Sequence, residues 1–134
     1  MNYQQYIPLM ARVFLAILFI RAGISHLLDF SGTQQMMAQK GLPLPGLLLA
    51  GNIVFQLVGA SLLLLGYKTR LGAILLILFL IPTTLVFHTD FSKDMQITAF
   101  LKNLAIIGGL LMVIYAGAGP VSLDERTNPH QTFK

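Results

Sequence analysis

Polar side chains that can bind a ligand occur inside long apolar segments of this chain. Seven of them are candidates for one binding site: Arg21, His26, Asn52, Gln56, His88, Lys102 and Asn103. Such groups are costly in an apolar medium and tend to face the interior of a helix bundle or a water-filled site. Cations and imidazoles can donate to a carbonyl or stabilise negative charge, and amides can orient a head group. These residue types therefore predict a ligand-binding pocket, and they single out no catalytic residue.

The segments that carry these residues are long enough to cross a membrane. A helix needs roughly 20 apolar residues to do so, and four segments qualify, at about residues 7–28, 46–65, 71–87 and 97–116. The 134-residue chain has 55% hydrophobic and only 10% charged residues, whereas soluble domains average about 25% charged residues. Apolar residues surround each predicted helix, which argues against a soluble bundle. We predict an all-α integral membrane protein, an antiparallel bundle of four transmembrane helices over residues 1–120, followed by a flexible polar tail over residues 121–134.

The connections between the predicted spans differ in length. The first, residues 29–45, is the longest. Ser31 or Thr33 is expected to cap a short interfacial helix there, which Gly41 and Pro43 end. The second connection is a tight turn that begins at Gly66, a residue suited to the left-handed position that ends a helix.

Charge bias predicts which way the spans run. Lys68, Arg70, Arg126 and Lys134 fall on one side and Lys40 and Lys93 on the other, and Lys and Arg accumulate on the cytoplasmic side. Both termini are therefore predicted to be cytoplasmic. In this orientation six of the seven candidates lie in the outer half of the bundle, and Gln56 lies close to the midplane. Arg12 lies near the inner face and is left out of the site.

Several of these residues also have structural interpretations. Arg21 and Lys102 can extend toward lipid head groups, and Asn52 and Gln56 can hydrogen-bond between helices. His26 and His88 can be imagined as ligands of a haem or metal. Both lie at helix ends, where interfacial histidines are common, so we expect no metal or haem site. The basic residues are scattered, and no binding to nucleic acid is expected.

Short motifs along nearly the whole chain resemble the DoxX family of small bacterial four-helix membrane proteins. They are Ala11-Arg12 with Phe19-Ile20-Arg21-Ala22-Gly23, Gly41-Leu42-Pro43-Leu44-Pro45, Leu65-Gly66-Tyr67-Lys68-Thr69-Arg70, Phe100-Leu101-Lys102-Asn103-Leu104, and Gly117-Ala118-Gly119-Pro120-Val121-Ser122-Leu123-Asp124. Each motif is short, and their shared order and spacing make the resemblance specific. Many family members carry Glu where this chain has Gln56, and many carry Lys near the position of His26. Gln56 cannot act as a base, so binding is favoured over acid–base chemistry.

The resemblance implies the fold strongly and leaves two functions open. The first is a redox-associated protein of a bacterial inner (plasma) or internal membrane that binds a quinone or another lipophilic ligand. The chain has no cysteine, so redox chemistry would need a bound cofactor or a partner. The second is a non-catalytic accessory or scaffold subunit of a larger membrane complex, in which Ala105 and Gly109 allow close helix packing. Membrane lipid is the expected surrounding, and a homo-oligomer or a larger membrane redox complex the expected assembly.

Overall fold

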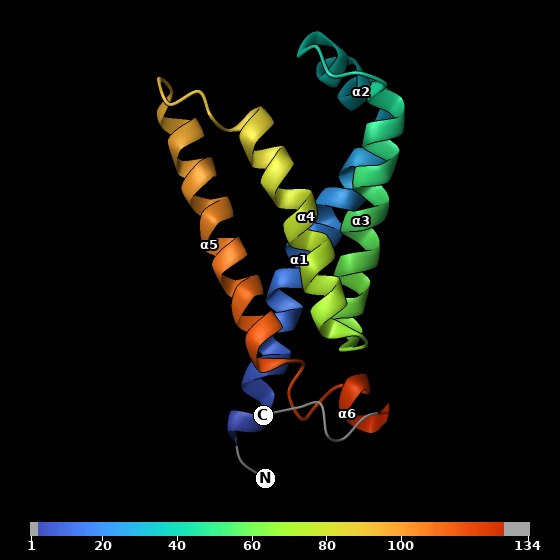
Figure 1. The fold of residues 1–134 in the computed structure, drawn as a ribbon, viewed down its shortest axis with the longest axis vertical. Helices are drawn as coiled ribbons and strands as arrows, with labels where there is room; N and C mark the ends of the chain where they lie inside the picture. Colours follow the sequence, from blue (N-terminus) through green and yellow to red (C-terminus); the bar gives the residue numbers. More distant parts are fainter. Residues whose placement is uncertain (1–2, 128–134) are drawn as a thin grey trace.

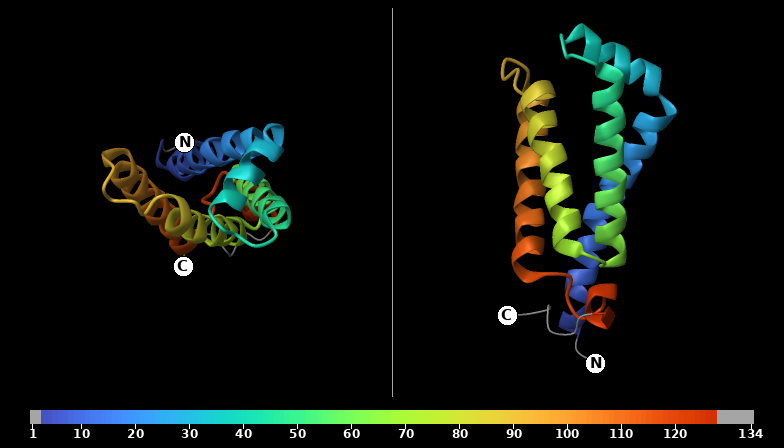
Figure 2. Two further views of the ribbon diagram at one scale, coloured as in Figure 1. Left: turned by 90° about the horizontal axis from the view of Figure 1, so that it is seen from above. Right: turned by 45° about the vertical axis from the view of Figure 1, so that its right-hand side comes forward.

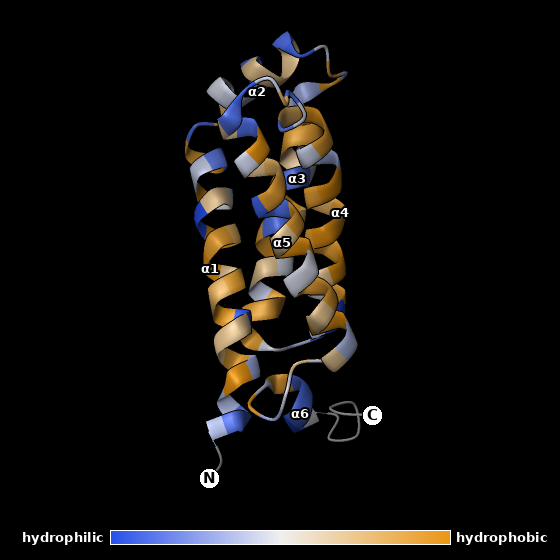
Figure 3. Cartoon of the chain, turned by 90° about the vertical axis from the view of Figure 1, so that its left-hand side faces the viewer, coloured by the Kyte–Doolittle hydropathy of each residue, from blue (hydrophilic) through white to orange (hydrophobic). Residues whose placement is uncertain are grey.

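The structure, a computed structural model, describes residues 3–127 of the chain. Its helices are η1 (Tyr3–Tyr6), α1 (Ile7–Leu28), α2 (Phe30–Gln39), α3 (Pro45–Leu65), α4 (Thr69–Phe87), α5 (Asp94–Ala116) and α6 (Leu123–Thr127). Four of them, α1, α3, α4 and α5, are long and apolar enough to cross a membrane. The predicted all-α four-helix membrane fold is confirmed, and the predicted spans start and end within three residues of these helices. Hydrophobic residues make up most of the length of these four helices, and hydrophilic residues gather at both ends of the bundle (Figure 3).

The bundle has two unlike ends. The terminal end carries η1, the α3–α4 turn and α6, and the loop end carries α2 and the loop between α4 and α5 (Figure 1). Helix α3 packs against α1 and α4, and α5 packs against α4 and less extensively against α1. Helices α1 and α5 lie close at the terminal end and separate toward the loop end (Figures 1 and 2). The bundle is therefore narrow at one end and open at the other.

Helices α3 and α4 approach closely because each has a glycine at the crossing. A Cβ atom added to Gly59 would lie 3.0 Å from the carbonyl oxygen of Gly72, and one added to Gly72 would lie 2.9 Å from the carbonyl oxygen of Gly59. Both glycines therefore permit a close approach of the two helix backbones. Small and branched buried side chains continue this contact into the core of the bundle: Ala16, Ala60, Leu63, Ala73, Leu76 and Leu110.

Helix α2 is present in the first connection, but it begins earlier than predicted. It starts at Phe30, directly after Asp29, whose carbonyl oxygen accepts a hydrogen bond from the Thr33 backbone N–H. Ser31 and Thr33 therefore lie inside the helix and do not cap it. Met37 is buried against α3, so one face of the helix packs on the bundle.

Arg12 fastens the terminal end of the bundle. Its guanidinium is only 1% exposed. Nη1 donates to the carbonyl oxygens of Leu63 and Leu64 at 3.1 and 3.4 Å, and Nη2 donates to the carbonyl oxygen of Val121. The last carbonyls of a helix have no partners within it. Arg12 thus satisfies the end of α3 and ties it to the segment that follows α5.

The segment after α5 folds back onto the α3–α4 turn. Gly117 and Gly119 have φ angles of 80° and 86°, a left-handed backbone that favours glycine. The Asp124 carboxylate accepts hydrogen bonds from the backbone N–H groups of Lys68 and Thr69, at 2.7 and 2.9 Å, and so caps the start of α4. This differs from the predicted flexible tail for residues 121–127, because the contacts come from a turn far away in the sequence. Residues 128–134 lie outside the described part of the chain.

Replacing Asp124 by Ala should lower the free energy of unfolding by about 1–2 kcal/mol, because α4 loses a side-chain cap. Asp124→Asn, which keeps one acceptor oxygen, should cost less. Thermal unfolding in detergent, followed by circular dichroism, measures both changes. Equal stability of the wild type and Asp124→Ala would contradict this role of the carboxylate.

Candidate functional site

A cavity of about 530 Å³ lies toward the loop end of the bundle. Helices α1, α2, α3, α4 and α5 all contribute to its wall. Six of the seven residues predicted for the site line it: His26, Asn52, Gln56, His88, Lys102 and Asn103. Cavities of this volume are typical of sites for a single small ligand.

Aromatic and aliphatic side chains form the apolar part of this wall. Phe19 of α1 and Phe79 of α4 meet edge to face, with ring centroids 6.4 Å apart. Leu18, Met36, Met37 and Leu49 add further apolar surface. This part of the wall suits the hydrocarbon portion of a ligand.

Three polar groups from helices α3 and α5 line the cavity below its loop end. At a rise of 1.5 Å per residue, Lys102 lies about 12 Å along α5 from the start of that helix. Asn52 and Gln56 lie about 10 and 16 Å along α3 from its start. The three side chains therefore lie at similar depths, as the sequence predicted. The cavity has an apolar wall with a polar layer.

Two buried atoms in this region have no hydrogen-bond partner among the described residues. They are Oε1 of Gln56 and Nδ1 of His26. Gln56 is 1% exposed, and a buried polar atom without a partner costs about 1–3 kcal/mol. Both residues line the cavity. They are the polar side chains that a ligand or an ordered water would best satisfy.

Asn103 and His88 bond within the protein. The Asn103 side-chain amide donates to Oγ1 of Thr84 at 3.0 Å and joins α5 to α4. Nδ1 of His88 lies 3.3 Å from Oε1 of Gln96. These two predicted ligand-binding residues shape the wall and contact α4 or α5, an interhelical role that was predicted as an alternative for Asn52 and Gln56 and not for them.

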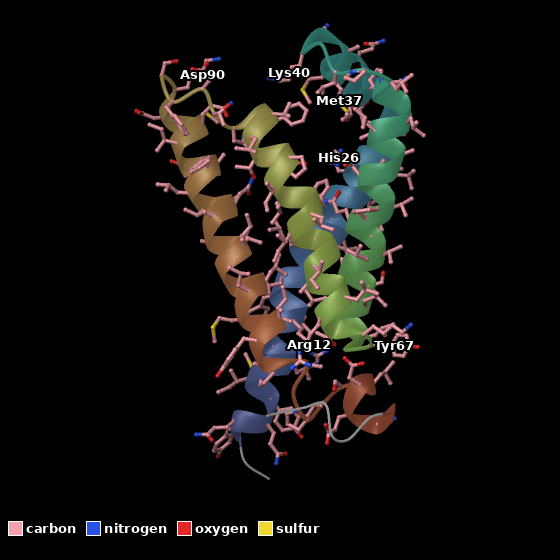
Figure 4. All side chains as sticks on the ribbon, in the orientation of Figure 1. Arg12, His26, Met37, Lys40, Tyr67 and Asp90 are labelled. Atoms are coloured by element: carbon pink, nitrogen blue, oxygen red, sulfur yellow. The ribbon has the colours of Figure 1, made fainter. Side chains whose placement is uncertain are left out.

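The loop end of the cavity is covered in part by α2 and the residue after it. Lys40 and Met37 lie at this end, above His26, and Arg12 lies at the opposite end (Figure 4). Nζ of Lys40 lies 5.2 Å from the ring centroid of Phe87, a cation–π contact that links the end of α2 to the end of α4. Sequence reasoning missed Lys40 as a lining residue. Its position at the end of a predicted interfacial helix was the available signal.

Arg21 is not brought to this cavity. It is exposed on α1 and is absent from the lining. On helix α1, Arg21 lies nearly opposite Arg12, and Arg12 faces the interior. Arg21 therefore points away from the bundle, as a side chain that extends toward lipid head groups does.

The cavity offers hydrogen-bonding and cationic groups, and within residues 3–127 no three His, Asp or Glu side chains are grouped as a metal site needs. Ala105, of the small-residue pair predicted for helix packing, is exposed on α5, and a Cβ atom on Gly109 would meet Leu15 of α1 at 3.6 Å. The arrangement is that of a multi-pass membrane protein with a ligand-sized cavity at one end of its bundle.

Comparisons with known proteins give the family. The DoxX family model matches residues 7–89, and the chain belongs to the DoxX family. The model of the SURF4 family also matches, over residues 51–130. No solved structure gives a significant match.

Two relatives are similar over most of their length. The chain is 36% identical over 120 residues to the inner membrane protein YqjF of Escherichia coli. These 120 residues cover 90% of this chain and 91% of the relative. The chain is 34% identical over 123 residues to the inner membrane protein YphA of Escherichia coli, with 88% of each chain covered. The ER-derived vesicles protein ERV29 of Saccharomyces cerevisiae is 35% identical over 80 residues, 56% of this chain and 26% of the relative.

Three groups of family-motif residues meet at the terminal end of the bundle. Arg12, the Leu-Gly-x-x-Thr-Arg turn and the Gly-x-Gly-x-x-Ser-Leu-Asp ending meet through the hydrogen bonds of Arg12 and Asp124. A Cβ atom on Gly66 would clash with Nη1 of Arg12, so the turn glycine leaves room for the guanidinium. These motif residues thus have a structural explanation, whereas Phe19, Ala22, Lys102 and Asn103, also from family motifs, line the cavity.

Proposed function

We propose that this DoxX-family protein binds a quinone or another lipophilic ligand in the cavity at its loop end, in a bacterial inner membrane and in association with membrane redox proteins. The single observation that carries the proposal is the cavity of about 530 Å³, in which an apolar wall adjoins a layer of amide, imidazole and ammonium groups. Pockets that bind small molecules combine mostly apolar walls with a few polar groups that orient the ligand. The unpartnered atoms of Gln56 and His26 support a ligand with a polar head.

Filling the cavity tests this proposal. Ala22 of α1 lines it, and Ala22→Phe should reduce binding of decylubiquinone or of an apolar fluorescent probe at least tenfold. Ala105→Phe, on an exposed part of α5 outside the lining, is the matched control and should bind as the wild type does. Fluorescence titration of the purified protein in a neutral detergent measures binding. Undiminished binding of all probes by Ala22→Phe would exclude this cavity as the site.

The accessory-subunit role is the alternative, and the exposed face of α5 favours it. Gly108 has open space beside its Cα, and Ala105 one turn earlier is exposed. Small residues on a lipid-facing helix permit close packing with another helix. Extraction in mild detergent that yields one discrete partner protein would support this role, and a stable lone protein that retains a ligand would favour the first.

A further inference from the structure

The ionisable groups that line the cavity are all basic. They are His26, Lys40, His88 and Lys102. No Asp or Glu of the described residues is part of the lining. A cavity lined by one sign of charge within low-dielectric walls focuses its field on a ligand of the opposite sign.

The described carboxylates at the loop end, Asp29, Asp90 and Asp94, are exposed and are not part of the lining. Asp90, in the α4–α5 loop, is exposed and forms an ion pair with Lys93 at 3.9 Å. Hydrogen bonds from the side chain and backbone of Ser92 lower the pKa of Asp90, and Lys93 and Lys40 lower it further. Asp29 is exposed at the α1–α2 junction. Lys102 and the two histidines therefore line a cavity to which the described residues contribute no carboxylate.

The lack of a carboxylate in the lining has its largest consequence for the ammonium group of Lys102. It lies about 12 Å along a membrane-spanning helix, and it makes no hydrogen bond or ion pair with any residue of the range 3–127. A charged side chain deep in a membrane is costly unless it is paired or hydrated. The hydrogen-bonding groups of Asn52 and Gln56 at similar depth could hold a neighbouring head group, and they bring no negative charge.

We infer that the cavity selects a single-chain amphiphile with a carboxylate head group, which lies against Lys102 while its hydrocarbon chain lies along Phe19, Phe79 and the neighbouring apolar wall. This choice rests on the proposed ligand-binding function and narrows it, because it favours acids over neutral molecules such as quinones. The carboxylate fits as the counter-ion of the ammonium, since charge-assisted hydrogen bonds are about twice as strong as neutral ones. A single chain fits because the volume is that of a site for one small ligand.

The test compares two probes that differ only in the head group. Palmitate and hexadecanol have the same chain, and each is titrated into the purified full-length protein in a neutral detergent. Palmitate should bind at least tenfold more tightly. Lys102→Met should remove this preference, whereas Lys102→Arg should keep it. Lys93→Met, which removes one positive charge at the same end but outside the lining, is the matched control and should behave as the wild type.

Each outcome has one meaning once circular dichroism shows that the variants are folded. Equal affinities for the acid and the alcohol overturn the inference and leave the proposed function in place. A preference for palmitate that survives in Lys102→Met also overturns it. Binding of phosphatidylglycerol vesicle lipid but not of palmitate excludes the single-chain acid. If neither palmitate, hexadecanol nor decylubiquinone binds, the proposed ligand-binding function itself fails.

Discussion

Replacing Arg12 by Met should lower the free energy of unfolding by about 2–4 kcal/mol. The guanidinium is buried, and it donates to the carbonyl oxygens of Leu63, Leu64 and Val121. Methionine fills similar space without a donor, so the end of α3 and the segment after α5 lose their shared partner. Lysine is not a conservative replacement, because it presents a single ammonium where two guanidinium nitrogens reach different acceptors.

Chemical or thermal unfolding in detergent measures this loss. Arg21→Met is the control on the same helix, because Arg21 is exposed and should change stability by no more than about 0.5 kcal/mol. Limited trypsin digestion gives a second measurement. Cleavage after Arg126 should be faster in Arg12→Met, since the segment from Val121 is no longer fastened. Equal losses in the two variants would show that Arg12 has no special role.

A second large effect is expected where α3 and α4 cross. Gly72→Leu should destabilise the protein by about 3 kcal/mol or more, because overpacking a tight contact typically costs 1–3 kcal/mol and can cost more. The first side-chain carbon alone would lie 2.9 Å from the Gly59 carbonyl oxygen and 2.9 Å from Cβ of Leu62. Backbone at this crossing cannot give way without separating the two helices.

Gly108→Leu is the matched control for this prediction. It makes the same substitution within a membrane-spanning helix, at a position where a Cβ atom meets nothing within 4 Å. It should leave the thermal midpoint and the size-exclusion profile close to those of the wild type. If Gly108→Leu were as disruptive as Gly72→Leu, the cause would be the added leucine in general and not the crossing of α3 and α4.

The sequence was informative about the fold because membrane insertion depends on average properties. Span length and hydropathy are properties of whole segments, and bilayer thickness fixes the length that a helix needs. The level of the polar residues followed from helical rise alone. This explains why His26, Asn52, Gln56 and Lys102 were placed in one region without knowledge of which helices touch.

Helical rise alone could not predict which arginine side chain is buried and which is exposed. Arg12 and Arg21 lie on the same span, and each had two solutions, extension toward the head groups or pairing inside the bundle. The partners of Arg12 are carbonyl groups 51, 52 and 109 residues away in the sequence. No local pattern encodes such partners, so the burial of Arg12 and the exposure of Arg21 depend on tertiary packing.

The same reason explains the segment from Val121. Its composition is that of a flexible tail, yet Ser122 Oγ accepts a hydrogen bond from the Glu125 backbone N–H and Asp124 reaches the α3–α4 turn. The family motif Gly-x-Gly-x-x-Ser-Leu-Asp was the available signal that this segment has a defined structure. Motifs of this kind are informative about backbone geometry even where their function is unknown.

The cap that Asp124 provides also bears on the order of biosynthesis. Asp124 follows all four spans in the chain, whereas the N–H groups that it caps belong to the start of α4. During translation, α3 and α4 enter the membrane before Asp124 is made, so the turn between them still lacks its cap. Arg12 likewise cannot donate to the carbonyl oxygen of Val121 until that residue has been made. The final closure of the bundle is therefore possible only after the fourth span has been made, which makes the last step of assembly dependent on residues outside the membrane-spanning helices.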